Sequence, residues 1–342
     1  MPVSNANTLI SALEKKIEAI ESDNPQNNSA LIHLFCEKYT YLYILKNQIT
    51  EPLKPLITET LKKLFKLETY AGLQIIGDSA AFNAAATDFV QDKLENKLSQ
   101  FNGLIYYGFT GEGANGVVAD LLEKDLLSSA QVIANIVAND SLTVINTYKC
   151  RFSEPIRNFL IVGDGNGGCK FGDDIELSDQ LAEQLICLEG GVISFAQLIN
   201  TLIFHQQPEI TIYSNLRPQD NSGFRPLFSA GELLLAFQAA THVTQMPNIL
   251  EHYLENHRFN PGNNEENGSK KKQVHQYFEK FNELDASKQN KILKKIKNLT
   301  QVSFLHKDVN NNNGIGTSSL FIKKYPHSSA IDDSSKNPEM RL

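Results

Sequence analysis

The sequence of 342 residues lacks several features that mark particular protein classes. It has only four cysteines, which are scattered without a CxxC pair or a histidine at zinc-ligand spacing: Cys36, Cys150, Cys169 and Cys187. This scatter indicates neither a zinc knuckle nor a disulfide framework and favours a reducing compartment. The serine-hydrolase elbow GxSxG and the phosphate-binding loop GxxxxGK(S/T) are missing too, which excludes those two enzyme classes. We expect no metal and no cofactor.

Long apolar runs are also missing. The longest, such as 232–240, are far shorter than the roughly twenty residues that a helix needs to cross a bilayer. The N-terminus, MPVSNANTL, has no basic start followed by an apolar core, so we do not expect a secretory signal peptide. These absences predict a soluble, cytoplasmic protein without integral membrane contact, and they leave export by a non-classical route open.

An excess of basic charge is missing as well. The formal net charge is -7 and the pI is near 5.7, so the surface repels a phosphate backbone at long range. We therefore expect no nucleic-acid partner. The lysine-rich segment 288–297 is a local exception that suits an anionic membrane or a nucleic acid, but a solvated helix face that packs on the core is the favoured interpretation.

The sequence does contain a clear change of pattern near residue 70. Before it, apolar residues at helical spacing predict helices over 9–20 and 29–49, and a third that follows Pro55 and ends near Leu67. Residues 1–70 are therefore predicted to be a helical N-terminal prefix.

From Gly72 on, short apolar runs alternate with helical segments, which is typical of a parallel sheet covered by helices. The predicted strands are 73–76, 103–107, 131–137, 159–162, 184–188 and 210–213. We predict an α/β fold over 71–256 with a doubly wound, mostly parallel, Rossmann-like sheet, whose ligands bind beyond the carboxyl ends of the strands. The remaining predictions are a linker over 257–272, a helical C-terminal extension over 273–325 and a disordered tail over 326–342.

Two glycine-bearing segments each follow a predicted strand and lead into a predicted helix: 106–120, YYGFTGEGANGVVAD, and 186–198, ICLEGGVISFAQL. Glycines clear side chains from a turn, so backbone N–H groups at a helix N-terminus can reach an anion. A turn without a ligand is the alternative for each segment, but two such turns in one sheet favour a nucleotide site. The candidate phosphate-binding residues are Gly108, Thr110, Gly111, Gly113, Gly116, Gly190, Gly191 and Ser194, the last as a hydroxyl cap of its helix. A further run, GDGNGG at 163–168, is interpreted as a flexible turn rather than a phosphate cradle or a calcium loop.

Together the two segments resemble the signatures of the Lonely Guy (LOG) family, formerly called lysine decarboxylases. The family's YGGGxxGLMGxVA lies over 107–119, and its PGGxGTxxE lies over 189–197, where the two glycines match and Ser194 replaces the threonine. The turn with Gly77 and Ser79 resembles the family's Gly-Ser turn after its first strand. The resemblance implies a nucleotide-binding core, a homodimer, and cleavage of the N-glycosidic bond of nucleoside 5'-monophosphates.

Two positions depart from the family's catalytic pattern. The motif's final glutamate, which acts at the ribose, corresponds to Gln197, which cannot accept a proton at neutral pH. The family's arginine position falls near Asp174, where a carboxylate would repel a phosphate. The chain thus resembles a divergent member without the catalytic Arg and Glu, and Glu189 and Asp174 are the candidate replacement carboxylates, unless both are merely solvated. Candidates for a replacement phosphate clamp are Lys170, Arg217 and Arg225.

We therefore expect the chain to bind a nucleotide or phosphoribosyl ligand at the two glycine-rich turns, with Gln197 nearby. The candidate activity is that of a nucleotide phosphoribohydrolase-like N-glycosidase. The alternative is a catalytically degenerate nucleotide sensor or protein-interaction module, whose helical extensions contact a protein partner.

Overall fold

Nine strands of the described residues form a single sheet in the computed structural model. The structure describes residues 31–36, 39–45, 53–78, 82–108, 112–137, 156–163, 175–217, 226–259 and 264–304. All of these ranges belong to one unit that spans residues 1–305. The strand order across the sheet is β1-β2-β6-β5-β4-β3-β7-β8-β9.

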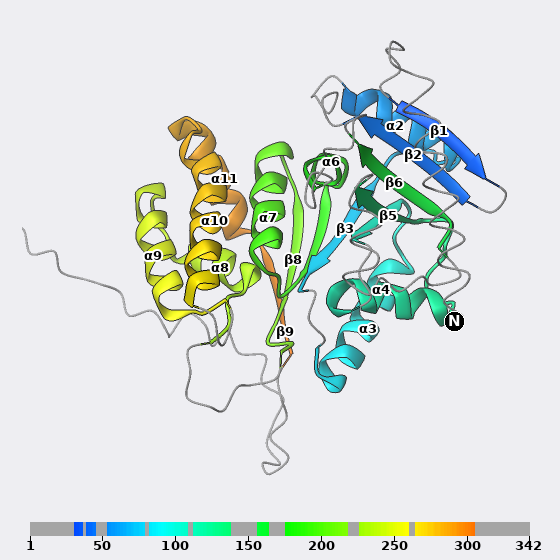
Figure 1. Ribbon diagram of the computed structural model, residues 1–342. Helices are drawn as coiled ribbons and strands as arrows, with labels where there is room; N and C mark the ends of the chain where they lie inside the picture. The colour runs from blue at the N-terminus through cyan, green and yellow to red at the C-terminus, as the bar shows by residue number, and fades with distance from the viewer. Residues whose placement is uncertain are drawn as a thin grey trace, which may run out of the picture. The chain divides into compact units, whose positions relative to one another are not determined.

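The sheet is parallel except at one edge (Figure 1). There β1 (Leu31–Cys36) pairs antiparallel with β2 (Tyr39–Leu45), and β2 pairs parallel with β6 (Asn158–Gly163). The other strands, all parallel to their neighbours, are β3 (Gly72–Gly77), β4 (Leu104–Gly108), β5 (Val132–Val137), β7 (Gln184–Leu188), β8 (Glu209–Ser214) and β9 (Thr300–Ser303). The six strands predicted between residues 73 and 213 are confirmed, as is the doubly wound α/β class.

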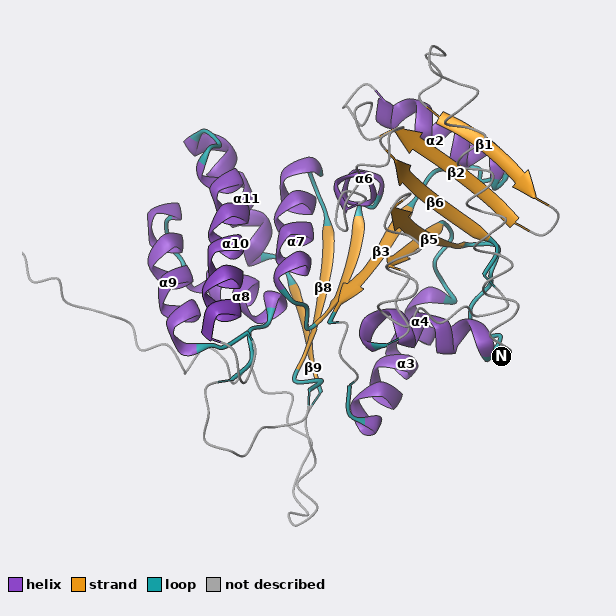
Figure 2. Ribbon diagram, in the orientation of Figure 1, coloured by secondary structure: helices purple, strands orange, loops and turns teal. Residues whose placement is uncertain are grey.

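Helices cover both faces of the sheet, which explains why its strands read as nearly continuous apolar runs (Figure 2). In β4, for example, Ile105 and Tyr107 belong to one buried cluster, whereas Leu104 and Tyr106 belong to another. On the first face lie α3 (Ala84–Leu98) and α4 (Gly113–Glu123). The second face carries α2 (Leu53–Leu64), α6 (Ile175–Leu181), α7 (Val192–Phe204), α8 (Ala230–Ala236), α9 (Met246–Asn256), α10 (Asn264–Asn282), α11 (Ala286–Lys297) and the short turns η2 (Phe237–Ala239) and η3 (Val243–Gln245).

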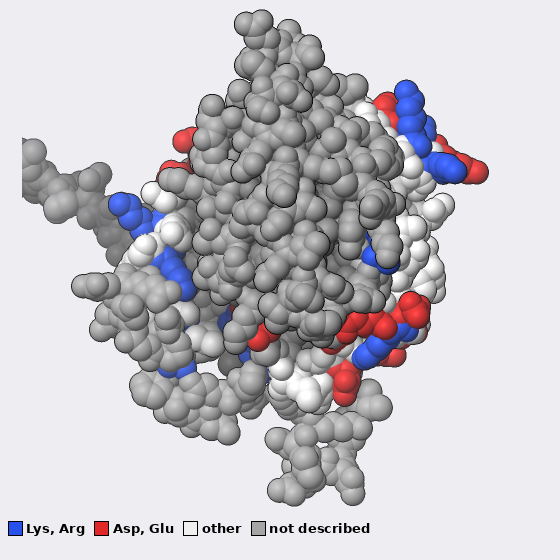
Figure 3. Space-filling view, turned by 45° about the vertical axis from the view of Figure 1, so that its right-hand side comes forward, with Lys and Arg blue, Asp and Glu red and all other residues white. Residues whose placement is uncertain are grey.

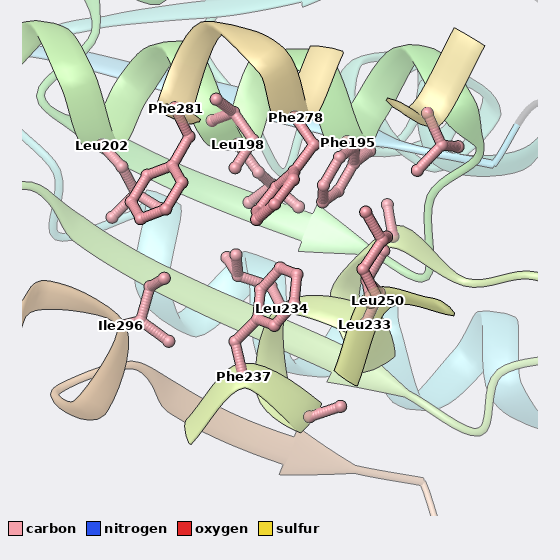
Figure 4. Close-up of a cluster of buried hydrophobic side chains, with 14 of the residues drawn as sticks. Phe195, Leu198, Leu202, Leu233, Leu234, Phe237, Leu250, Phe278, Phe281 and Ile296 are labelled. Atoms are coloured by element: carbon pink, nitrogen blue, oxygen red, sulfur yellow. The ribbon is translucent and has the colours of Figure 1, made fainter. Parts of the chain in front are cut away.

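The C-terminal helices α10 and α11 are part of the core. Phe278 lies between Phe237 and Phe281, with ring centroids 5.6 and 5.2 Å apart, and Phe195 of α7 lies in the same cluster (Figure 4). Fully burying one such ring contributes about 1.5–3 kcal/mol. The helical periodicity predicted for 273–299 therefore reflects packing against α7 and α8. Among the helices that the structure describes, none is both long enough and apolar enough to cross a membrane.

The lysine-rich helix α11 packs on the core with its apolar side, as favoured from the sequence. Ile292 and Ile296 are buried, whereas Lys294 is exposed. Lys295 points back toward α7, and its Nζ donates hydrogen bonds to the carbonyls of Leu202 at 2.7 Å and His205 at 2.6 Å. This lysine thereby satisfies carbonyls at the C-terminal end of α7. On the face shown in Figure 3, the described acidic and basic side chains are interspersed.

The predicted helix over 29–49 is wrong, because β1 and β2 occupy 31–45. These segments read LIHLFC and YTYLYIL, and their aromatic and branched residues favour an extended chain. The pairing of β2 with β6 then decides between the two patterns. Only the last helix of the predicted prefix is confirmed, as α2; the predicted helix over 9–20 lies outside the described residues.

The linker predicted over 257–272 is wrong in its second half, because α10 already begins at Asn264. The glutamates and lysines of NEENGSKKK are good helix formers, which offset the cost of about 1 kcal/mol for Gly268. The helical extension predicted over 273–325 is wrong at 300–303, where β9 pairs with β8, and its part after residue 304 lies outside the described residues. The tail predicted over 326–342 lies outside the described residues.

Candidate functional site

The strand order reverses direction between β3 and β7. From β3 the chain proceeds through β4, β5 and β6 on one side, and it then returns to add β7, β8 and β9 on the other. In doubly wound folds this switch point is where the carboxyl ends of the strands leave room for a ligand. The candidate site therefore lies at the ends of β3 and β7, after Gly77 and Leu188.

The turn after β3 is held by backbone hydrogen bonds on both sides. The N–H of Asp78 donates to the Leu188 carbonyl at 3.1 Å, and the Asp78 carbonyl accepts from the N–H of Ala114, in α4, at 2.9 Å. A Cβ at Gly77 would lie 2.3 Å from the Leu188 carbonyl oxygen and 2.8 Å from the Ala114 Cβ. The close approach of β7 and α4 therefore requires glycine at position 77. The N–H of Ala114, in the first turn of α4, therefore already donates its hydrogen bond within the protein.

The first glycine segment is described on both sides of 109–111. Gly108 ends β4, and Gly113 opens α4 with a φ of +62°, a left-handed conformation that glycine adopts without strain. Gly116 is buried within α4, where its N–H donates to the carbonyl four residues earlier at 3.2 Å. Gly108 and Gly113 thus flank the turn, whereas Gly116 belongs to the packed body of the helix.

The turn after β7 contains two consecutive residues with positive φ, Glu189 at +63° and Gly190 at +94°. Their carbonyls accept hydrogen bonds from the second and first residues of α8, at 2.9 and 2.8 Å. A Cβ at Gly190 would lie 2.7 Å from the Ser194 Cβ, whereas one at Gly191 would meet nothing within 4 Å. Conformation and packing therefore fix Gly190, while Gly191, the N-cap of α7, borders open space.

Ser194 does not have the capping role predicted for it. The N-cap of α7 is Gly191, and no side chain caps this helix. Ser194 lies within the first turn and is buried, and its Oγ donates to the Gly77 carbonyl at 3.2 Å. The hydroxyl therefore ties α7 to the end of β3.

Three charged side chains gather over the end of β7. Arg217 forms an ion pair with Asp78, and its Nη1 also donates to the Phe228 carbonyl at 3.0 Å. The Oε1 atom of Glu189 accepts a hydrogen bond from the N–H of Leu216 at 2.7 Å. The side chains of Arg217 and Asp78 are each 17% exposed, and Glu189 is only 4% exposed. The cluster therefore lies largely out of water, where charges interact strongly.

Burial raises the pKa of Glu189 above its ordinary value. The positive charge of Arg217 and the hydrogen bond from Leu216 oppose this rise, and the negative charge of Asp78 adds to it. A carboxyl group with a raised pKa at the carboxyl edge of a sheet is suited to holding or transferring a proton. Burial also raises the pKa of the Cys187 thiol, which makes it a poor nucleophile.

The structure brings most of the described predicted residues together. Those at the junction of β3, β7 and α7 are Gly77, Glu189, Gly190, Gly191 and Ser194. Gly108 and Gly113 lie at the neighbouring turn, and Gln197 is half-buried further along α7. The predicted residues that lie outside the described ranges are Ser79, Thr110, Gly111 and Asp174, together with Lys170 and Arg225.

Sequence reasoning missed Asp78 and Asn135 and gave Arg217 only as one of three clamps. Asp78 directly follows β3, and Arg217 follows β8 by three residues. Two residues of opposite charge, each shortly after a predicted strand, could have predicted this ion pair from the sequence. Asn135 is the polar residue of the run VIANIV in β5. An amide inside a buried strand was the corresponding signal there.

No protein-family model and no curated protein matches the chain. The fold and the site define its class as a doubly wound α/β protein with a charged cluster at the switch point of its sheet. In the part of the chain that the structure describes, no group of three or more His, Cys, Asp or Glu side chains could hold a metal ion.

Proposed function

We propose that the chain binds a nucleotide or a related phosphoribosyl ligand at the carboxyl edge of β3, β4 and β7. The observation that carries this proposal is the cluster of Glu189, Asp78 and Arg217 at the switch point, the place where open α/β sheets take their ligands. The helices α4 and α7 begin at the same edge, after Gly113 and Gly191, and helix N-termini attract phosphate groups. The partial match to the LOG signatures supports the same class of ligand.

The candidate reaction is hydrolysis of the N-glycosidic bond of a nucleoside 5'-monophosphate. The oxygen of a water molecule bonds to C1' as the C1'–N bond breaks, the carboxylate of Glu189 takes a proton from that water, and the departing base takes up a proton from solvent. The Leu216 N–H holds Oε1 of Glu189 in place. Glu189 later returns the proton to solvent, which completes the cycle.

A second candidate is a nucleotide-binding protein without catalysis. It is favoured by the internal partners of the site, because Ala114 N–H, the Ser194 hydroxyl and Oε1 of Glu189 are all engaged within the chain. A site that only binds its ligand does not need a carboxylate that is free of internal hydrogen bonds to accept a proton. The homodimer implied by the LOG resemblance and the protein partner expected at the helical extensions belong to this proposal, and light scattering after gel filtration tests the dimer.

The deciding experiment incubates the protein with AMP, other nucleoside monophosphates and NAD, and follows both free base and binding heat. Glu189→Gln removes the titratable group but keeps the side chain's shape. Glu183→Gln is the matched control, because Glu183 is exposed and precedes β7 as Glu189 follows it. Base release by the wild type and the control, but not by Glu189→Gln, supports the hydrolase. Saturable binding without release supports the binding protein, and no binding at millimolar ligand contradicts both.

A further inference from the structure

Asn135 of β5 places a buried hydrogen-bond acceptor at the carboxyl edge of the sheet. The residue is 7% exposed, and its Oδ1 has no hydrogen-bond partner among the residues that the structure describes. Its neighbours across the strands are Gly108 on β4 and Leu160 on β6, neither of which has a side-chain donor. A buried amide oxygen that accepts no hydrogen bond lowers the stability of the folded protein, so an asparagine at this position needs an explanation.

The surroundings of Gly108 place a second carboxamide close by. Along β4, Gly108 shares a face with Tyr106, and along β5, Asn135 shares that face with Ile133. A Cβ at Gly108 would lie 3.0 Å from Nδ2 and 3.4 Å from Oδ1 of Asn115, in the first turn of α4. Two carboxamides, one from a strand and one from a helix, therefore flank the glycine that ends β4.

Asn158, a second buried asparagine of the same sheet, has clear hydrogen-bond partners within the protein. Asn158, at the start of β6, is 5% exposed, and its Nδ2 donates to the carbonyls of Ser129 at 3.0 Å and Val132 at 3.1 Å. Its amide thus joins the start of β6 to the segment that leads into β5. The Oδ1 of Asn135, in contrast, accepts no hydrogen bond from any residue in the described ranges.

We propose that Asn135 is a specificity residue of the ligand site, whose Oδ1 accepts a hydrogen bond from an N–H or O–H group of the bound nucleotide. This inference rests on the proposed function and names the ligand's chemistry. Asparagine amides pair with base edges that offer an amino donor beside an acceptor, as adenine does. The favoured donor is therefore the amino group of an adenine-type base, and a ribose hydroxyl is the other source of the same chemistry.

The test compares Asn135→Leu and Asn135→Ala with the wild type and with Asn158→Leu, by calorimetric titration with AMP, IMP and 2'-deoxy-AMP. One hydrogen bond corresponds to about fivefold in affinity. We expect the wild type to bind AMP at least about fivefold more tightly than IMP, and both Asn135 variants to lose this preference. A fivefold preference for AMP over 2'-deoxy-AMP that the variants lose assigns the donor to the ribose instead. Without ligand, Asn135→Leu should melt no lower than the wild type, whereas Asn158→Leu should melt lower.

Two results overturn the inference in distinguishable ways. If the wild type binds AMP and both Asn135 variants keep its affinity and its preferences among the three ligands, Asn135 is not a specificity residue, and the proposed function stands. If the wild type shows no saturable binding of any of them, the proposed function and the inference fail together. Asn135→Ala keeps the test decisive in case leucine does not fit beside Leu160.

Discussion

Arg217 and Asp78 form an ion pair that reaches across the end of a strand to which neither belongs. Asp78 follows β3 and Arg217 follows β8, and β7 lies between these two strands. Both charges act on Glu189, which directly follows β7. The hydrogen bonds of the sheet join neighbouring strands, whereas this ion pair joins the ends of β3 and β8, which are separated by β7.

The first prediction concerns the stability that this pair provides. Because both side chains are mostly buried, Arg217→Met should remove the opposite charge beside Asp78 and lower the free energy of unfolding by about 2 kcal/mol. Adding Asp78→Asn should restore about 1–2 kcal/mol, because the two residues are coupled. Urea denaturation of the wild type, both single variants and the double variant measures this coupling. Losses that simply add would show that the pair contributes nothing.

The same pair predicts an effect on ligand affinity. Asp78 neutralises Arg217, so a bound phosphate has to compete with the carboxylate for the guanidinium. Asp78→Asn should therefore strengthen binding of a nucleoside monophosphate about tenfold, and Arg217→Met should weaken it by a similar factor. Titration calorimetry at fixed salt measures both. Equal affinities for the two variants would place the phosphate away from Arg217.

The raised pKa of Glu189 predicts a pH dependence with a definite sign. Stability from such a carboxyl group is fully present below its ordinary pKa of about 4.5 and is lost as the pH rises through the higher value in the folded state. The unfolding free energy of the wild type should therefore fall relative to Glu189→Gln as the pH rises above about 4.5. Denaturation at a series of pH values gives this difference, with the exposed Glu183→Gln as control. A difference that rises with pH would reverse the assignment.

The two glycines after β7 should respond differently to the same substitution. Gly190→Ala introduces a Cβ at a φ of +94° and only 2.7 Å from the Ser194 Cβ, so we expect a loss of about 2–4 kcal/mol. Gly191→Ala adds a methyl group where nothing lies within 4 Å and should change stability by less than about 0.5 kcal/mol. Thermal melting ranks the two variants. Loss of nucleotide binding in a stable Gly191→Ala protein would support a ligand at this turn.

Lys295 should stabilise the fold from outside the site. Lys295→Met keeps the aliphatic part of the side chain but removes the donors to the carbonyls of Leu202 and His205, so a loss of about 1–2 kcal/mol is expected. Lys294→Met, at the adjacent exposed position, is the matched control and should be nearly neutral. Chemical denaturation compares them. Equal effects would mean that the end of α7 does not need this lysine.

The sequence predicts the central strands well because each is a short apolar run that is buried on both faces, as LIYYG in β4 illustrates. It fails at 29–49, where apolar residues suit a helix and a strand alike, and where pairing with the distant β6 decides. The glycine turns were also predictable, since Gly77, Gly113 and Gly190 stand where close packing or positive φ requires them. Their polar partners were not, because the pairing of Asp78 with Arg217 arises only from the strand order.

The pairing of β2 with β6 defines the smallest fragment that can fold as this sheet. A fragment that begins at residue 71, where the alternating pattern starts, would lose β1 and β2 and leave β6 with an unpaired edge. Exposed parallel edges recruit other strands, so such a fragment should aggregate. At the other end, a fragment that stops at 256 would remove β9 from β8 and strip α10 from α7. Work with shortened chains should therefore keep at least residues 31–304.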